Sequence, residues 1–181
     1  METSLNILKQ GKVLLYPTDT VYGLGCDATN FEAVKKIYQL KQREESKALI
    51  CLVCDVKMLE KYIETIPETA YQIIEFATKP TTIIYDNPIG LANNLIAKDN
   101  TLAIRIVHSG FAHNLIKTLG KPIVSTSANI SGEPTPKTFN EISPQILKGV
   151  DYVVNLPCES NNKPSTIIKL SNTGEVKIIR E

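Results

Sequence analysis

The chain has 181 residues and a formal net charge of +1 at pH 7, and 43% of its residues are hydrophobic. This length and apolar content predict a single domain, residues 1–181, with a sizeable core. The near-zero charge argues against a generally basic nucleic-acid binder, so an anion site has to be a local concentration of cations. The sequence shows neither a secretory pattern at its start nor an apolar run of about 18 residues, so we expect a cytoplasmic protein with no membrane partner.

The first half of the chain alternates helical and strand patterns. Thr29 and Glu32 are spaced as a capping box at the start of a helix. The residues between the first strand and that helix are rich in hydroxyls and glycine and predict a turn. The expected elements are a helix at 4–10, a strand at 12–16, a turn at 17–25, a helix at 31–41, a strand at 48–53 and helices beginning at 55 and 67.

The second half continues the alternation and ends in a strand pair. A second capping box, Thr138 to Glu141, predicts a helix that runs to about Lys148. The other expected elements are strands at 81–85, 101–107 and 122–126, a helix at 111–119, and strands at 151–155, 165–170 and 175–180. The whole pattern predicts an α/β domain with a twisted, mixed sheet and flanking helices.

The cysteines and histidines do not form a metal-binding pattern. Cys51 and Cys54 are spaced as CxxC, but they lie in an apolar, strand-like run, where residues three apart point to opposite faces. No second pair completes a zinc site. We interpret these cysteines as buried structural thiols, and His108 and His113 as structural. No protein-held metal is expected.

Three cations, Lys41, Arg43 and Lys47, lie at the end of a predicted helix and in the loop after it. Lysine supplies a mobile charge and arginine a two-pronged donor, which together suit a polyphosphate. A solvated helix end is the alternative, because cations there complement the helix dipole.

Hydroxyl side chains cluster at the ends of predicted strands. They are Thr18 and Thr20, Ser125 to Ser127, and Ser165 with Thr166. Ligands of open α/β sheets bind in crevices at strand ends, although hydroxyls also serve as ordinary turn and cap residues. Arg105 shares a strand face with Thr101 and Ala103, and a buried arginine needs an anionic partner. These residues predict a site for an anionic, phosphate-bearing small molecule.

Several longer motifs resemble those of the YrdC-type threonylcarbamoyl-AMP synthases. They are Tyr16-Pro-Thr-Asp-Thr-Val-Tyr-Gly-Leu24, Lys41-Gln-Arg43, Ser125-Thr-Ser-Ala-Asn-Ile-Ser-Gly132 and Pro164-Ser-Thr166. They occur in the family's order from about Gly11 to Arg180, and the chain resembles the family's short, single-domain form. The resemblance implies a twisted α/β sheet around a concave, positively lined site.

The resemblance also implies an activity. ATP, L-threonine and bicarbonate would be joined to give threonylcarbamoyl-AMP and pyrophosphate. Mg2+ would arrive with ATP, and the product would serve the modification of tRNA, through direct contact with tRNA or through downstream modification proteins. An RNA-binding regulatory module of the same fold, without synthase activity, is the alternative function.

Roles follow by position from the same resemblance. Lys41 and Arg43 would be the catalytic basic pair that neutralises the triphosphate. The positions that match the threonine site are Thr20, Arg105, Ser125, Ser165 and Leu52, of which Leu52 can offer only its backbone for hydrogen bonding. The positions that match nucleotide contacts are Arg43, Lys47, Thr101, Ser127, Asn129, Thr135 and Arg180.

Overall fold

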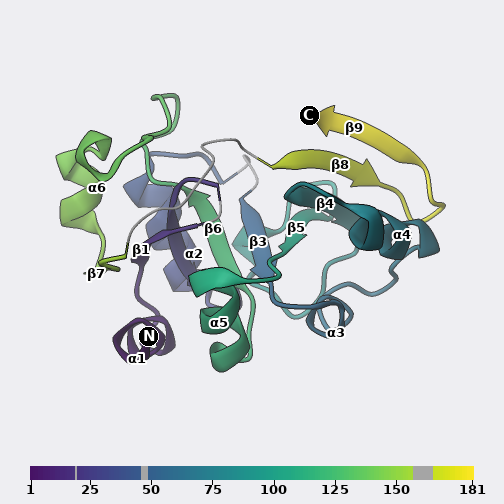
Figure 1. The fold of residues 1–181 in the computed structure, drawn as a ribbon, viewed down its shortest axis with the longest axis horizontal. Helices are drawn as coiled ribbons and strands as arrows, with labels where there is room; N and C mark the ends of the chain where they lie inside the picture. The colour runs from purple at the N-terminus through teal and green to yellow at the C-terminus, as the bar shows by residue number, and fades with distance from the viewer. Residues whose placement is uncertain (19, 46–48, 157–164) are drawn as a thin grey trace.

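A computed structural model describes residues 1–18, 20–45, 49–156 and 165–181 (Figure 1). The helices are α1 (Glu2–Lys9), α2 (Phe31–Leu40), α3 (Val56–Leu59), α4 (Glu68–Phe76), α5 (Gly110–Leu119) and α6 (Pro144–Gly149), with short 3-10 helices η1 (Asn93–Leu95) and η2 (Phe139–Glu141). The strands are β1 (Leu14–Pro17), β2 (Tyr22–Asp27), β3 (Ile50–Val53), β4 (Thr81–Asp86), β5 (Thr101–Ile106), β6 (Ile123–Ser127), β7 (Tyr152–Val153), β8 (Thr166–Leu170) and β9 (Val176–Arg180).

The strands of the described residues form one sheet in the order β7-β1-β2-β6-β3-β5-β4-β8-β9. The pairs β1/β7, β3/β5 and β4/β8 are parallel, and the remaining pairs are antiparallel. The sheet is therefore mixed, which confirms the predicted fold class.

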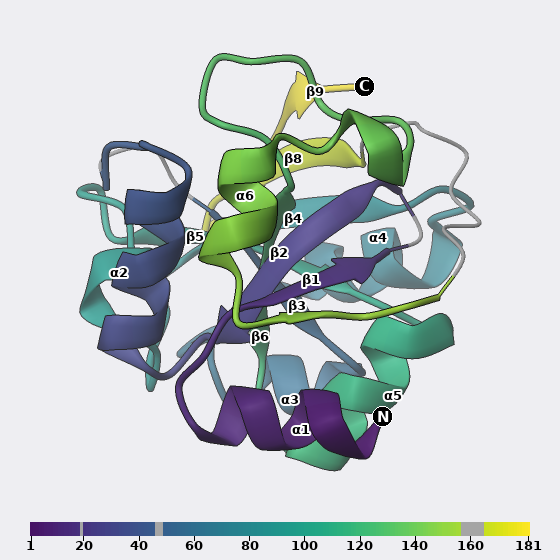
Figure 2. The same ribbon diagram turned by 90° about the vertical axis from the view of Figure 1, so that its left-hand side faces the viewer.

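The helices α1, α3 and α5 lie together beneath the strands in Figures 1 and 2, and α1 packs against α5. The main core includes Ile37, Leu52, Ile104 and Leu115, all of which are almost completely buried. The loop after β6 and the β8–β9 hairpin rise above the strands instead (Figure 1). The site lies on the side of the sheet that faces the loop after β6 and the β8–β9 hairpin, away from α1, α3 and α5.

Strand β2 replaces much of the turn predicted at residues 17–25, so that part of the prediction was wrong. Its glycines pack against neighbours instead of making a turn. A Cβ on Gly25 would lie 2.6 Å from Cε1 of Tyr16 and 3.0 Å from the Val124 carbonyl oxygen. Glycine thus allows the fully buried Tyr16 ring to pack closely against the backbone of β2.

Both capping-box predictions were wrong in the position of the cap. The side chain of Asn30, not Thr29, caps α2, because its Oδ1 accepts a hydrogen bond from the Ala33 N–H at 3.0 Å. Glu141 does accept a hydrogen bond from Thr138, at 3.0 Å. The element that begins after Thr138, however, is the short 3-10 helix η2 and not an α-helix. The α-helix α6 begins later, after a Ser143 cap.

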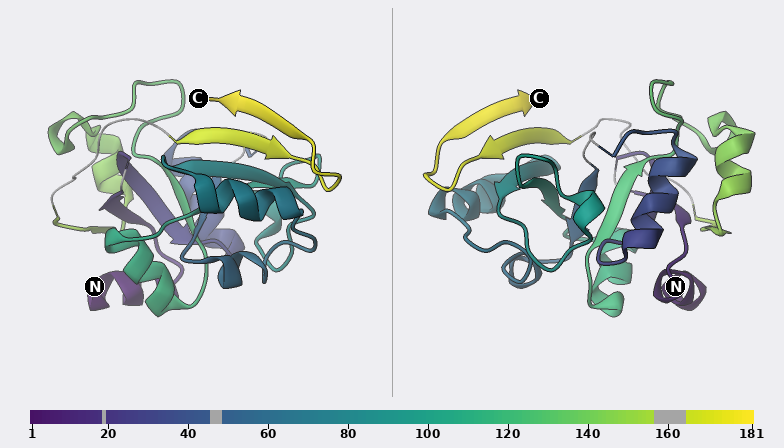
Figure 3. Two further views of the ribbon diagram at one scale, coloured as in Figure 1. Left: turned by 45° about the vertical axis from the view of Figure 1, so that its right-hand side comes forward. Right: turned by 180° about the vertical axis from the view of Figure 1, so that it is seen from behind.

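The two chain ends lie on opposite sides of the molecule, with the N-terminus beside α1 and the C-terminus after β9 (Figure 3). Cys51 and Cys54 are buried free thiols, as predicted. No helix in the described ranges is long and apolar enough to cross a membrane.

Candidate functional site

A cavity of about 460 Å3 opens on the sheet face below the β6 loop and the β8–β9 hairpin. It brings together residues that are far apart in the sequence. All the residues matched to the threonine site line it, namely Thr20, Leu52, Arg105, Ser125 and Ser165. Four of those matched to nucleotide contacts also line it, namely Arg43, Ser127, Thr135 and Arg180.

Strand register explains how the floor of this cavity is built. Ser125 of β6 lies opposite Ile50 of β3, which lies opposite Ala103 of β5 and then Ile84 of β4. All of these residues line the cavity. Paired residues on neighbouring strands point to the same face, so an apolar strip runs from the Ser125 hydroxyl toward β4.

A second row of paired residues carries two guanidinium groups. Arg105 lies opposite Thr82 of β4, then Ile167 of β8, then Arg180 of β9. With strands about 4.8 Å apart, the Cα atoms of Arg105 and Arg180 are separated by roughly 14 Å across three spacings. The cavity therefore receives arginine side chains from two strands that are not neighbours, β5 and β9.

Buried hydroxyl pairs fix the orientation of the polar groups near Arg105. The Oγ atoms of Thr82 and Ser165 lie 2.8 Å apart, and both residues are buried. In the segment between β1 and β2, Thr18 Oγ1 donates to the Val21 carbonyl at 2.7 Å and lies 2.9 Å from Thr20 Oγ1. Such hydrogen bonds hold hydroxyls in one rotamer before a ligand arrives.

Guanidinium groups give the cavity its charge. The described lining residues include Arg43, Arg105 and Arg180 and no carboxylate. Arg180 donates through Nε and Nη2 to the Ser165 carbonyl at 3.1 and 2.8 Å, and burial lowers the pKa of its side chain. A cavity with fixed cations and hydroxyls is suited to a carboxylate and phosphate groups.

Lys41 is not among the described residues that line the cavity. This position differs from the prediction that Lys41 contacts a triphosphate. Its side chain is 1% exposed, and its Nζ donates to the backbone carbonyls of Ser127 and Asn129. Burial, and to a lesser extent the nearby charge of Arg43, lowers the pKa of Lys41 to about 8.

Asn129 and Thr101 also lie outside the described cavity lining. Asn129 Nδ2 donates to the carbonyls of Ile130 and Glu133, so its side chain shapes its own loop. Thr101 shares the face of Arg105, as the alternation predicts, but it lies four residues away and donates to Asp99 at 2.7 Å. At about 3.3 Å per residue, that spacing places it some 13 Å from Arg105. Lys47 lies outside the described residues.

Sequence reasoning missed mostly apolar lining residues. They are Val21, Gly23, Leu49, Ile50, Ile84, Ala103, Ile167 and Ile179. The alternation rule could have found some of them, because Ala103 lies two residues before Arg105 and Ile84 two residues after Thr82. Others depend on strand order, which the sequence alone does not specify.

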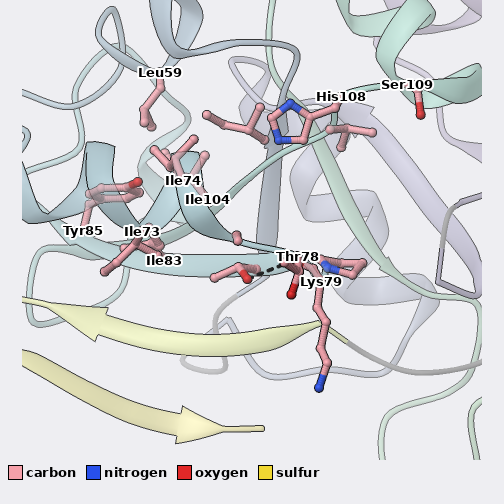
Figure 4. A pocket seen from close by; sticks show the side chains of 15 residues that line it. Leu59, Ile73, Ile74, Thr78, Lys79, Ile83, Tyr85, Ile104, His108 and Ser109 are labelled. Atoms are coloured by element: carbon pink, nitrogen blue, oxygen red, sulfur yellow. Dashed lines mark hydrogen bonds between the residues drawn. The ribbon is translucent and has the colours of Figure 1, made fainter.

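A second cavity, of about 250 Å3, lies on the opposite face of β4 and β5. Figure 4 shows Ile73, Ile74, Ile83 and Ile104 directed into it and Lys79 directed away from it. His108, predicted to be structural, is exposed at its rim, whereas His113 bonds the Val107 carbonyl through Nδ1 at 2.7 Å. None of the predicted site residues that the structure describes lines this cavity.

Within the described parts of the chain, no group of three or more His, Cys, Asp or Glu side chains is placed to hold a metal ion. The donors that the 460 Å3 cavity offers are hydroxyls and guanidinium groups. They fit the oxygens of a phosphate chain better than they fit a bare cation.

Comparisons with known proteins agree with this geometry. A family model named for Sua5, YciO and YrdC, and described as telomere recombination, matches residues 6–181. A threonylcarbamoyl-AMP synthase of Pseudoalteromonas translucida is 37% identical over 170 residues, which cover 91% of this chain and 89% of that protein.

Two solved structures have the same fold. P. abyssi Sua5 in complex with L-threonine superposes with a TM-score of 0.86 at 28% identity, over 93% of this chain. The chain spans about half of that protein, since the match covers 50% of it. E. coli YciO superposes with a TM-score of 0.85 at 26% identity, over 99% of this chain and 87% of that one.

Proposed function

Because this chain belongs to the Sua5/YciO/YrdC family, we propose that it is a threonylcarbamoyl-AMP synthase. It would join L-threonine, bicarbonate and ATP into threonylcarbamoyl-AMP and pyrophosphate, as a nucleotidyltransferase. The observation that carries this proposal is the single cavity that gathers Arg105 with Thr20, Ser125 and Ser165, and also contains Arg43 and Arg180. Two comparisons support this proposal. A P. translucida relative is named for this activity, and P. abyssi Sua5 binds L-threonine.

The cavity suggests where each substrate binds. Arg105 would take the threonine carboxylate as a two-pronged partner, and the Ser125 and Ser165 hydroxyls would bind the remaining polar atoms. The α-phosphate would lie near Ser127, and the outward phosphates near Arg43. The volume of about 460 Å3 is in the range of ordinary ligand pockets.

The reaction needs little covalent chemistry from the protein. The threonine amine takes up bicarbonate with loss of water to give a carbamate. A carbamate oxygen then attacks the α-phosphorus in line, a new P–O bond forms, and the bond to pyrophosphate breaks. Positioning of the two reactants and neutralisation of charge by arginines would supply most of the acceleration.

Mg2+ would enter with ATP as part of the substrate. The described lining residues include no carboxylate, so phosphate oxygens and water would supply most of its coordination. When bound, the ion would neutralise charge on the outward phosphates beside Arg43.

The test is pyrophosphate release from ATP, with threonine and bicarbonate omitted in turn. The proposal predicts that release depends on both. Release that depends on neither, together with salt-dependent binding to tRNA, would favour an RNA-binding module instead. Delivery of the product to tRNA, directly or through modification proteins, belongs to the proposal.

A cytoplasmic location is also proposed. The buried free thiols of Cys26, Cys51 and Cys54 are compatible with a reducing compartment.

A further inference from the structure

The buried ammonium of Lys41 lies at a junction between two segments that are far apart in the sequence. It donates to the Ser127 carbonyl, to the Asn129 carbonyl at 2.7 Å and to Asn129 Oδ1 at 3.5 Å. We infer that Lys41 is a positioning residue, which fixes Arg43 and the loop after β6 relative to each other and makes no contact with ATP. This inference rests on the proposed function.

Backbone contacts make the same connection. The Ser131 N–H donates to the Lys41 carbonyl at 2.8 Å, so Lys41 bonds this loop through both its side chain and its main chain. Asn129 extends the network, because its Nδ2 donates to the Glu133 carbonyl at 2.7 Å. The chain from Ser127 to Ser131 is thus hydrogen-bonded at several points to Lys41 at the end of α2.

The turn at Gln42 separates the roles of its two neighbours. Gln42 has φ 49°, in the left-handed region that few non-glycine residues adopt. Lys41 is therefore directed into the protein, whereas Arg43 lines the cavity. A residue held in this uncommon conformation depends on its surroundings, and the Lys41 junction is part of them.

The donors of Lys41 are already used. An ammonium has three N–H donors, and three oxygens lie within 3.5 Å of its nitrogen. A phosphate could bind this group only by displacing backbone carbonyls that would then be left buried without a partner, at a cost of about 1–3 kcal/mol each. Since the side chain is 1% exposed, the ammonium also has no open path to the cavity.

The first experiment compares Lys41→Met with the wild type in the absence of any ligand, using amide NMR. Lys35→Met is the matched control, because Lys35 is an exposed lysine of α2, the helix that ends just before Lys41. We expect the amide signals of Ser127 and Ser131 to shift in Lys41→Met and hydrogen exchange at the Ser131 amide to accelerate at least tenfold. The control should change neither. Unchanged signals in ligand-free Lys41→Met would overturn the inference, whatever reaction the protein catalyses.

The second experiment uses the wild type, so it remains decisive if Lys41→Met does not fold. NMR titration of the Lys41 Cε signal follows the pKa of its amine, which should stay near 8 when Mg-ATP is added. A rise of more than one unit on ATP binding would mean direct contact with phosphate and would overturn the inference.

Kinetics complete the test. We expect kcat of Lys41→Met to fall about 100-fold, as for a misplacement of reacting groups by about 1 Å. Lys35→Met should match the wild type.

Discussion

The hydroxyl pair between Thr82 and Ser165 makes a sharp prediction about threonine binding. Thr82→Val keeps the shape of the side chain but removes the Oγ that lies 2.8 Å from Ser165 Oγ. Thr82 is fully buried and Ser165 is 5% exposed, so water cannot readily replace the lost partner. The Ser165 hydroxyl would then be free to rotate away from the ligand position.

The size of the effect follows from one neutral hydrogen bond. Such a bond contributes about 1 kcal/mol net, and a buried hydroxyl left without a partner costs about 1–3 kcal/mol. The free energy of unfolding should therefore fall by about 1–3 kcal/mol. If the freely rotating Ser165 hydroxyl weakens the binding free energy of threonine by about 1 kcal/mol, the Kd for threonine rises about fivefold.

The assay is threonine binding by calorimetry, with unfolding in urea measured in parallel. Thr81→Val is the matched control, because Thr81 is on the adjacent position of the same strand and its Oγ1 donates to the Lys79 carbonyl at 3.0 Å, outside the site. It should change the Kd by less than twofold. Combining Thr82→Val with Ser165→Ala should weaken binding no more than Ser165→Ala does alone, because both changes act through one hydroxyl.

An unchanged Kd for Thr82→Val in a folded protein would refute this reasoning. So would a double variant that binds threonine much more weakly than Ser165→Ala.

Other predictions concern stability and the size of the site. The pKa of Lys41 is about 8 in the folded protein and 10.5 in the unfolded chain, so between these pH values only the unfolded chain holds the proton. The unfolding free energy of the wild type should therefore rise with pH over this range, relative to that of Lys41→Met. The full rise is about 3 kcal/mol, measured by urea unfolding at both ends of this range, and an equal pH dependence in the two proteins would contradict it. Gly25→Ala should cost about 1–3 kcal/mol in the same assay, because its Cβ would lie 2.6 Å from the Tyr16 ring. Asn30→Ala should cost about 1 kcal/mol through loss of the α2 cap, and no change would mean that another group replaces it. Gly23→Ala should weaken threonine binding, seen by calorimetry, because its Cβ would lie 3.1 Å from Thr18 Cγ2 and 3.4 Å from Ser125 Oγ.

Local patterns predicted most of the elements. Alternation in residues 101–107 placed Arg105 and Ala103 on one face, and both line the 460 Å3 cavity, whereas the intervening Ile104 and the following Ile106 line the 250 Å3 cavity. Strand β2 was missed because Gly23 and Gly25 are typical of turns, and only the packing of Tyr16 across the sheet explains a strand there.

The site was harder to predict where orientation decides the role. Lys41 and Arg43 are two residues apart and chemically alike, yet one is buried against carbonyls and the other lines the cavity. Their separation depends on the left-handed conformation of Gln42, which its residue type does not favour. Thr101 shows a second limit. It lies on the same strand face as Arg105, but four residues away, and it does not line the described cavity with Arg105.

The position of Arg180 at the end of β9 has a practical consequence for protein engineering. Any tag or fusion partner attached after Glu181 would emerge one residue from a cavity-lining guanidinium. The same addition before Met1 would leave from the far side of the molecule (Figure 3). Affinity handles and reporter proteins therefore belong at the amino end, and a carboxyl-terminal fusion with poor turnover should be suspected of obstructing substrate entry.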